Sequence, residues 1–137
     1  MSTPHFTLAH WCILLAAMLP IACAGIAKSG KFNKPRREGG FDNHNPRAWL
    51  AKQTDWRARA NAAQANSFEA LPFFIGAVLV AQQLGANQAQ VDLLALLYMV
   101  ARILYVMLYL ADNAKLRSVV WSIALLLNIG ILFIGYR

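Results

Sequence analysis

Eight polar residues in an otherwise apolar chain have the types and the spacing to bind a small charged ligand. Arginine and asparagine side chains bind carboxylates, a glutamate can hold an ammonium group, and tyrosine hydroxyls can donate to a carboxylate or a thiolate. Such a set suits a ligand that carries several charges. The eight residues are Arg59, Asn66, Glu69, Arg102, Tyr105, Tyr109, Arg117 and Ser118.

The first members of this set share one face of a predicted helix. Spacings of seven and three residues bring Arg59, Asn66 and Glu69 close together at helical pitch. Glu69 is followed by the apolar run 70–75. A carboxylate at such a border needs a partner or a ligand to stay ionised.

A second face carries Arg102, Tyr105 and Tyr109, at intervals of three and four residues within another apolar run. An arginine at the centre of a membrane span costs about 2.5–3.5 kcal/mol on insertion scales, so we expect it to face the bundle interior. The guanidinium fork matches a carboxylate. We therefore predict a bidentate ion pair between Arg102 and Glu69.

The elements that position these residues are predicted to be membrane-spanning helices. The chain has 137 residues, of which 58% are hydrophobic and 14% are charged, and its mean hydropathy is +0.43. These values are typical of an integral membrane protein. A span takes about 20 apolar residues. The sequence predicts an all-α, four-helix transmembrane bundle in a single domain, 1–137, with spans at about residues 6–27, 60–82, 93–111 and 118–136.

The first and second predicted helices have sequence features that bear on their extent. The first run has no Lys or Arg before it and is longer than a signal-peptide core of about 7–15 residues, so we expect a retained helix rather than a cleaved signal. Asn45 followed by Pro46 is typical of a helix start. Because only Pro72 interrupts the pattern after it, we predict one helix over 46–83, about 55 Å long. Its first half would project from the membrane.

The charges predict an orientation. The net charge is +7, and six Lys and Arg residues gather over 28–47, between the first two spans. Lys115 and Arg117 lie between the third and fourth spans, whereas the connection 85–92 has no Lys or Arg. Positive charge marks the cytoplasmic side, so loops one and three are predicted to be cytoplasmic. No retention or transit signal is visible, which favours a bacterial inner membrane.

Several kinds of site have no signal in the sequence. The three histidines are scattered without HExxH or CxxC spacing, so we expect no metal site. Phosphate-binding loops, nucleophile elbows and dinucleotide fingerprints do not occur. The sequence lacks the interleaved aromatic and basic residues that would indicate nucleic-acid binding. The tryptophans, Trp121 among them, fit membrane-interface anchors. A reaction without a bound cofactor, or simple binding, is what remains.

The polar pattern resembles that of the MAPEG family, the membrane-associated proteins in eicosanoid and glutathione metabolism, and in particular a bacterial-type member. The resemblance implies a four-helix protomer assembled as a homotrimer, with glutathione as co-substrate between neighbouring protomers at the cytoplasmic side. Lipophilic molecules and membrane lipids are the other implied partners. It rests on Arg59…Asn66-x-x-Glu69-x-x-Pro72-Phe73 and on Arg102-x-x-Tyr105-x-x-x-Tyr109 leading to Arg117-Ser118.

The resemblance also implies roles for individual residues. Arg117 matches the arginine that activates the thiol, with Ser118 beside it as a second catalytic candidate. Arg102 matches the arginine paired with the helix-two glutamate. The glutathione-binding positions that it implies are Asn66, Glu69, Arg102, Tyr105 and Tyr109.

Three functions are consistent with these residues. The first is a glutathione-dependent transferase or peroxidase that acts on lipophilic electrophiles. The second is a non-catalytic lipid- or glutathione-binding protein. Ala62 favours it, because animal glutathione-using members of the family carry a further arginine at that position. Lys28 or Lys31 is a candidate replacement for a different family residue, the basic one at the end of the first helix. The third is a small proton-coupled exporter that uses Glu69, against which a pairing with Arg102 would argue.

Overall fold

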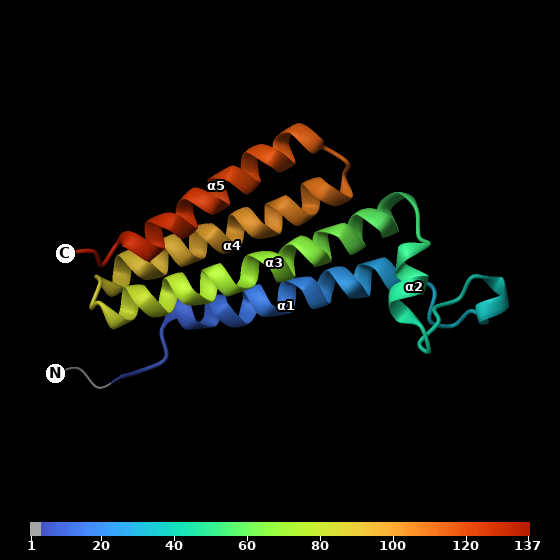
Figure 1. Cartoon of the computed structure of the whole chain (residues 1–137), viewed down its shortest axis with the longest axis horizontal. Helices are drawn as coiled ribbons and strands as arrows, with labels where there is room; N and C mark the ends of the chain where they lie inside the picture. Colours follow the sequence, from blue (N-terminus) through green and yellow to red (C-terminus); the bar gives the residue numbers. More distant parts are fainter. Residues whose placement is uncertain (1–3) are drawn as a thin grey trace.

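The computed structural model describes residues 4–137, and over that range every regular element is helical. The four long helices run side by side, with the C-terminus at one end of the bundle and the loop 29–45 at the other (Figure 1). All four are long and apolar enough to cross a membrane. The predicted all-α, four-helix fold is thus confirmed. The elements are α1 (Leu8–Lys28), the 3-10 turn η1 (Arg36–Glu38), α2 (Pro46–Ala51), α3 (Asp55–Gln83), α4 (Gln88–Leu110) and α5 (Ala114–Phe133).

Side-chain caps fix where three of the long helices begin. Thr7 accepts the backbone N–H of His10 through Oγ1, and the His10 ring accepts the Thr7 N–H in return. Asn87 and Asn113 accept backbone N–H groups at the starts of α4 and α5. Such caps satisfy backbone donors that have no partner inside the helix. Because of them, α4 and α5 begin before the apolar runs that predicted them.

The bundle packs through small residues and exposes large apolar ones. α3 and α4 contact each other and both of the outer helices, α1 and α5. Small side chains on the buried faces allow the helix backbones to approach closely, as in other membrane bundles. Large apolar side chains such as Leu97 and Leu126 point outward, as a lipid-facing surface requires. The small buried residues of α1 and α3 include Ala9, Cys12, Ala16, Cys23, Ala27, Ala60, Ala63, Ser67, Ala77 and Ala81.

The predicted single helix over 46–83 is wrong, because the chain breaks between α2 and α3. The Gln53 side chain donates to the Trp49 carbonyl and ends α2, and Asp55 has a φ of 56°. Trp49 and Leu50 pack against Ala27 and the α3 residue Ala60, which holds α2 across the end of the bundle. The first half of the predicted helix therefore does not project as a straight rod.

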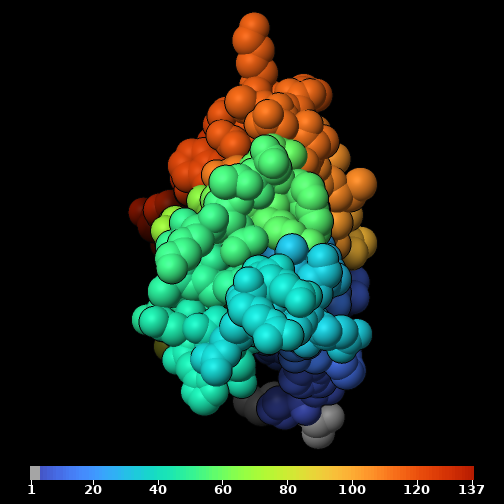
Figure 2. All heavy atoms as spheres, turned by 90° about the vertical axis from the view of Figure 1, so that its right-hand side faces the viewer, coloured from blue at the N-terminus to red at the C-terminus, as the bar shows by residue number. Residues whose placement is uncertain are grey.

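Aromatic packing holds the loop 29–45 against this end of the bundle. The Phe41 ring meets Phe32 and Trp49 edge-on, at centroid distances of 5.6 and 5.2 Å. A Cβ on Gly40 would collide with the Lys34 carbonyl, so the turn requires glycine here. Figure 2 shows this loop, α2 and the start of α3 at the end of the bundle away from the C-terminus, with the α4–α5 connection above them.

Two arginines of α3 tie the same end together. The Arg57 side chain donates to the Ala27 carbonyl at 2.9 Å, and Arg59 donates to the Leu110 carbonyl at 3.2 Å. These carbonyls lie at the last turns of α1 and α4, where helices leave acceptors unpaired and the helix dipole favours a cation. Arg59 thus holds a helix end in place, and it does not line the cavity described below.

Candidate functional site

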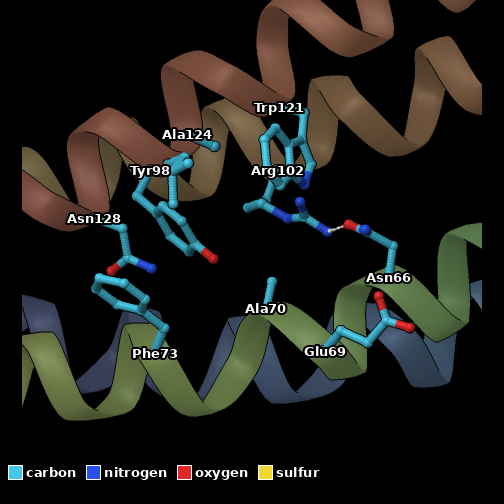
Figure 3. Close-up of a pocket in the computed structure, with 10 residues that line it drawn as sticks. Asn66, Glu69, Ala70, Phe73, Tyr98, Arg102, Trp121, Ala124 and Asn128 are labelled. Carbon is cyan, nitrogen blue, oxygen red and sulfur yellow. Dashed lines mark hydrogen bonds between the residues drawn. The ribbon is translucent and has the colours of Figure 1, made fainter.

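A cavity of about 200 Å³ lies between α3, α4 and α5, within the part of the bundle that the apolar runs form. The polar side chains of Asn66, Glu69 and Arg102 gather at one end of it, and that of Asn128 lies at the other (Figure 3). Phe73 and Trp121 border it and are 39% and 41% exposed, so the cavity opens between α3 and α5. Its lining residues are Asn66, Glu69, Ala70, Phe73, Tyr98, Arg102, Trp121, Ala124, Leu125 and Asn128.

Arg102 reaches into the polar end of this cavity, where neutral partners hold its guanidinium. The side chain is 3% exposed and donates to Asn66 Oδ1 at 2.8 Å and to Ser67 Oγ at 3.5 Å. The first of these is a charge-assisted hydrogen bond, of the stronger kind. The arginine therefore faces the bundle interior, as the cost of exposing it to lipid requires.

The predicted ion pair between Arg102 and Glu69 is wrong. Over residues 4–137 the Glu69 carboxylate forms no ion pair, and the side chain is exposed although it borders the cavity. The reason lies in the rotation of about 100° per residue along a helix. Seen from Asn66, Ser67 lies about 100° to one side and Glu69 about 60° to the other. Arg102 approaches the side of Asn66 and Ser67, away from Glu69.

Arg102 also begins a row of stacked side chains that runs toward the loop end of the bundle. Its guanidinium carbon lies 4.4 Å from the centroid of the Tyr105 ring. The Tyr105 and Tyr109 rings meet edge-on at 5.7 Å, and the Arg117 guanidinium carbon lies 4.1 Å from the Tyr109 centroid. Cation–π contacts fix the orientation of both cations. We call these four residues the arginine–tyrosine ladder.

A family model links this geometry to known proteins. The model of the MAPEG family matches residues 8–136. The chain belongs to the MAPEG family. Searches of curated proteins and of solved structures gave no match. MAPEG members are membrane proteins that generally use glutathione, so this chain is an integral membrane protein of a glutathione-related family.

The structure groups the MAPEG-pattern residues into two neighbouring sets. Asn66, Glu69 and Arg102 line the cavity, and the ladder joins Arg102 to Tyr105, Tyr109 and Arg117. Arg117 is half-buried at the first turn of α5. Ser118, the next residue, is exposed and lines neither the cavity nor the ladder.

The two lysines offered as replacements for a family cation lie elsewhere. The Lys28 ammonium sits over the Phe41 ring, 4.6 Å from its centroid. Lys31 borders a separate surface hollow beside the loop 29–45. Ala62 is half-buried and does not line the cavity. In this single MAPEG chain neither Lys28 nor Lys31 lines the cavity.

Three cavity residues with polar side-chain atoms were missed by sequence reasoning. Tyr98 lies one turn before Arg102 and stacks on Phe74 with ring centroids 4.3 Å apart. Trp121, interpreted from the sequence as an interface anchor, lies one turn after Arg117 and lines the cavity. Asn128 is the third, and the signal for it was available, since an asparagine in the middle of an apolar span is costly to bury without a partner.

Proposed function

We propose that this MAPEG protein is a membrane-embedded, glutathione-dependent transferase or peroxidase that acts on lipophilic electrophiles. The observation that supports this most is the arginine–tyrosine ladder, which holds Arg117 beside Tyr109 at the loop end of the bundle. A thiol with a pKa near about 8.5 is mostly protonated at neutral pH, and a nearby guanidinium stabilises the nucleophilic thiolate. Arg117 would supply that charge, with Ser118 as a second candidate donor.

The remaining ladder and cavity residues would bind the peptide. Asn66 and Glu69 offer an amide and a carboxylate for the peptide groups and the ammonium of glutathione, and Tyr105 and Tyr109 offer hydroxyls. Arg102 already donates to Asn66 and would orient that amide while adding positive charge. The thiol would then lie between the two arginines of the ladder.

Glu69 and the cavity volume favour a site completed by a second copy of the chain. Small-molecule sites usually measure about 300–1,000 Å³, more than this cavity offers, so glutathione would lie mostly outside it, against its Arg102 end. Glu69 is exposed within the apolar half of α3, where an ionised carboxylate needs a partner. A neighbouring protomer or the glutathione ammonium would supply one. A homotrimer, as the family resemblance implies, is the assembly that we propose.

The proposed location is a bacterial inner membrane, with loops one and three on the cytoplasmic side. The loop 29–45 contains four Lys and Arg residues, and it lies at the same end of the bundle as the start of α5, which carries Lys115 and Arg117 (Figure 1). The positive-inside rule then places the arginine–tyrosine ladder near the cytoplasm, where glutathione is available.

The test is conjugation of glutathione to a generic aryl halide by the purified protein. Arg117→Ala is expected to lose most of the turnover while glutathione still binds by calorimetry, because thiol activation fails and the peptide contacts remain. Lys115→Ala removes a positive charge two residues away and serves as the matched control, with turnover unchanged. Bound glutathione with neither conjugation nor peroxide reduction in the wild-type protein would reject the enzyme.

That last result would support the second hypothesis, a non-catalytic binding protein. Ala62 favours it, since the absent arginine leaves one carboxylate of glutathione without its family partner. A binding protein would be stabilised thermally by glutathione and would show no turnover with any electrophile or peroxide.

The exporter hypothesis is affected by the geometry of Glu69. Its expected pairing with Arg102, which argued against a proton-carrying role, does not form in the single chain. A flux driven by a pH gradient in proteoliposomes and lost in Glu69→Gln would support an exporter. We expect no such flux, because family membership favours glutathione chemistry.

A further inference from the structure

A polar side chain without a partner lies at the end of the cavity away from Arg102. Asn128 is 3% exposed in the middle of apolar α5, and its Oδ1 has no hydrogen-bond partner within residues 4–137. Figure 3 shows its amide at the cavity edge beside Phe73, with the Tyr98 hydroxyl pointing into the space between Asn128 and Arg102. Buried amides are nearly always hydrogen-bonded, so an amide with an unpaired oxygen at the edge of a cavity indicates a ligand or ordered water.

The cavity between its two polar ends is apolar and narrow. Figure 3 shows Ala70 and Ala124 between these ends, and Leu125 is a further apolar lining residue. The cavity volume of about 200 Å³ is below the roughly 300–1,000 Å³ of most small-molecule sites. The cavity can hold one slender small molecule, provided that glutathione contacts Asn66 and Glu69 from outside the cavity.

The helix rise sets the length of an occupant. Trp121 and Asn128 are seven residues apart on α5, which is about 10 Å along the helix axis. Trp121 lies one turn from Arg117, on the side where the thiol is proposed to lie. A molecule that spans the cavity would thus have one end near the thiol and the other end at Asn128.

We propose that this cavity is the acceptor pocket, and that it takes an elongated aliphatic electrophile with a hydroxyl group at the end remote from its reacting carbon. Asn128 and Tyr98 would hydrogen-bond that hydroxyl and determine specificity for it. This inference rests on the proposed transferase function and assigns the substrate class. Entry would occur from the bilayer, through the opening between α3 and α5.

A hydroxyl fits this end of the cavity better than other polar groups. It both donates and accepts, so it can pair with either atom of the Asn128 amide and also with the Tyr98 hydroxyl. A charged group would find no opposite charge there, because the cavity cation, Arg102, and the cavity carboxylate, Glu69, both lie toward the other end. A purely apolar tail would leave the amide unpaired.

Iodoalkanols provide the probe, with the iodide at one end of an alkyl chain and the hydroxyl at the other. The glutathione thiolate forms a carbon–sulfur bond as the carbon–iodine bond breaks, iodide leaves with the bonding electrons, and the thiol proton goes to water. Each iodoalkanol is compared with the iodoalkane in which a methyl group replaces the hydroxyl. A chain series from butyl to decyl tests the length of the cavity.

We expect kcat/KM to be about tenfold higher for the iodoalkanol than for its methyl analogue at the best chain length, after division by the uncatalysed ratio. Asn128→Leu should remove this preference while the KM for glutathione stays unchanged. Tyr98→Phe should reduce the preference in part. Leu126→Ala, on the exposed face of the same helix, is the matched control and should keep it.

Equal turnover of both members of each pair by the wild-type protein would overturn the acceptor assignment and leave the transferase proposal standing. A preference for the iodoalkanol that persists in Asn128→Leu would also overturn the acceptor assignment. A preference that does not depend on chain length would do the same, since either result places the hydroxyl elsewhere.

A binding measurement separates this inference from the proposed function. Unreactive alkanols of the same lengths are titrated into the purified protein, and their affinity is measured by calorimetry. The matching alkanes are the reference and should bind more weakly. One outcome is that alkanols bind the wild-type protein and not Asn128→Leu, while neither the wild type nor any variant conjugates glutathione. That outcome would refute the transferase and uphold the hydroxyl site. Absence of alkanol binding to the wild-type protein would refute the site.

Discussion

The buried Arg102 guanidinium depends on Asn66 and is independent of Glu69, and this can be measured as a difference between two coupling energies. Asn66→Leu removes the acceptor at 2.8 Å and keeps a side chain of similar volume. The remaining side-chain acceptor is Ser67 Oγ at 3.5 Å, the far limit of a hydrogen bond. The cation would then be buried with one weak side-chain acceptor and the face of the Tyr105 ring.

The expected magnitude follows from that geometry. A hydrogen bond to a charged group contributes about 1.5–3 kcal/mol, and loss of one partner leaves the other desolvated and unpaired. Asn66→Leu should therefore lower the free energy of unfolding by about 2–3 kcal/mol. The coupling energy between Asn66 and Arg102 should be about 2 kcal/mol in a double-mutant cycle with Arg102→Leu. Because Glu69 and Arg102 do not touch, their coupling should stay below about 0.5 kcal/mol.

The assay is reversible unfolding by dodecyl sulfate in mixed micelles, without glutathione, on the four proteins of each cycle. Glu69→Gln serves in the second cycle, since it removes the charge and keeps the shape. A coupling with Arg102 that is larger for Glu69 than for Asn66 would contradict the reasoning, because it would mean that the carboxylate holds the arginine after all.

Other contacts give predictions of similar size. Arg59→Ala should cost about 1–2 kcal/mol of unfolding free energy, because the last carbonyls of α4 lose their donor, and Arg59→Lys should recover part of it. Asp92→Ala should cost about 1 kcal/mol of unfolding free energy, since the Asp92 carboxylate accepts the Ala9 N–H at 2.9 Å at the start of α1. Chemical unfolding of the Arg59 and Asp92 variants measures both costs. Gly40→Ala should speed proteolysis within the loop 29–45 while leaving the spans resistant, because a Cβ there collides with the backbone.

Much of the bundle was predictable because membrane crossing imposes a length that the sequence displays. Four apolar runs predicted four helices, although α4 and α5 begin at their asparagine caps, before those runs. The buried face of Arg102 was also predictable, since exposure of an arginine to lipid at mid-span is costly. These features depend on periodicity and on the bilayer, which both act along a single helix.

Features that depend on the relation between helices were not predictable in this way. Glu69 was the obvious charge partner for Arg102 by residue type, yet the rotation of α3 turns Asn66 and Ser67 toward the arginine instead. The break before Asp55 accompanies the packing of Trp49 against Phe41, a residue of the loop 29–45. No local sequence pattern predicts how that loop packs. These contacts follow from tertiary packing, which outweighs local helix propensity.

The central claim is that Arg117, held by the arginine–tyrosine ladder, keeps the thiol of bound glutathione ionised at neutral pH. The most direct test is the ultraviolet absorption band of the thiolate, measured as glutathione is titrated into the purified protein. The band should grow with occupancy in the wild-type protein and be absent in Arg117→Ala at a glutathione concentration that calorimetry shows to be saturating. Saturating binding without a thiolate band, or an equal band in the variant, would contradict the account.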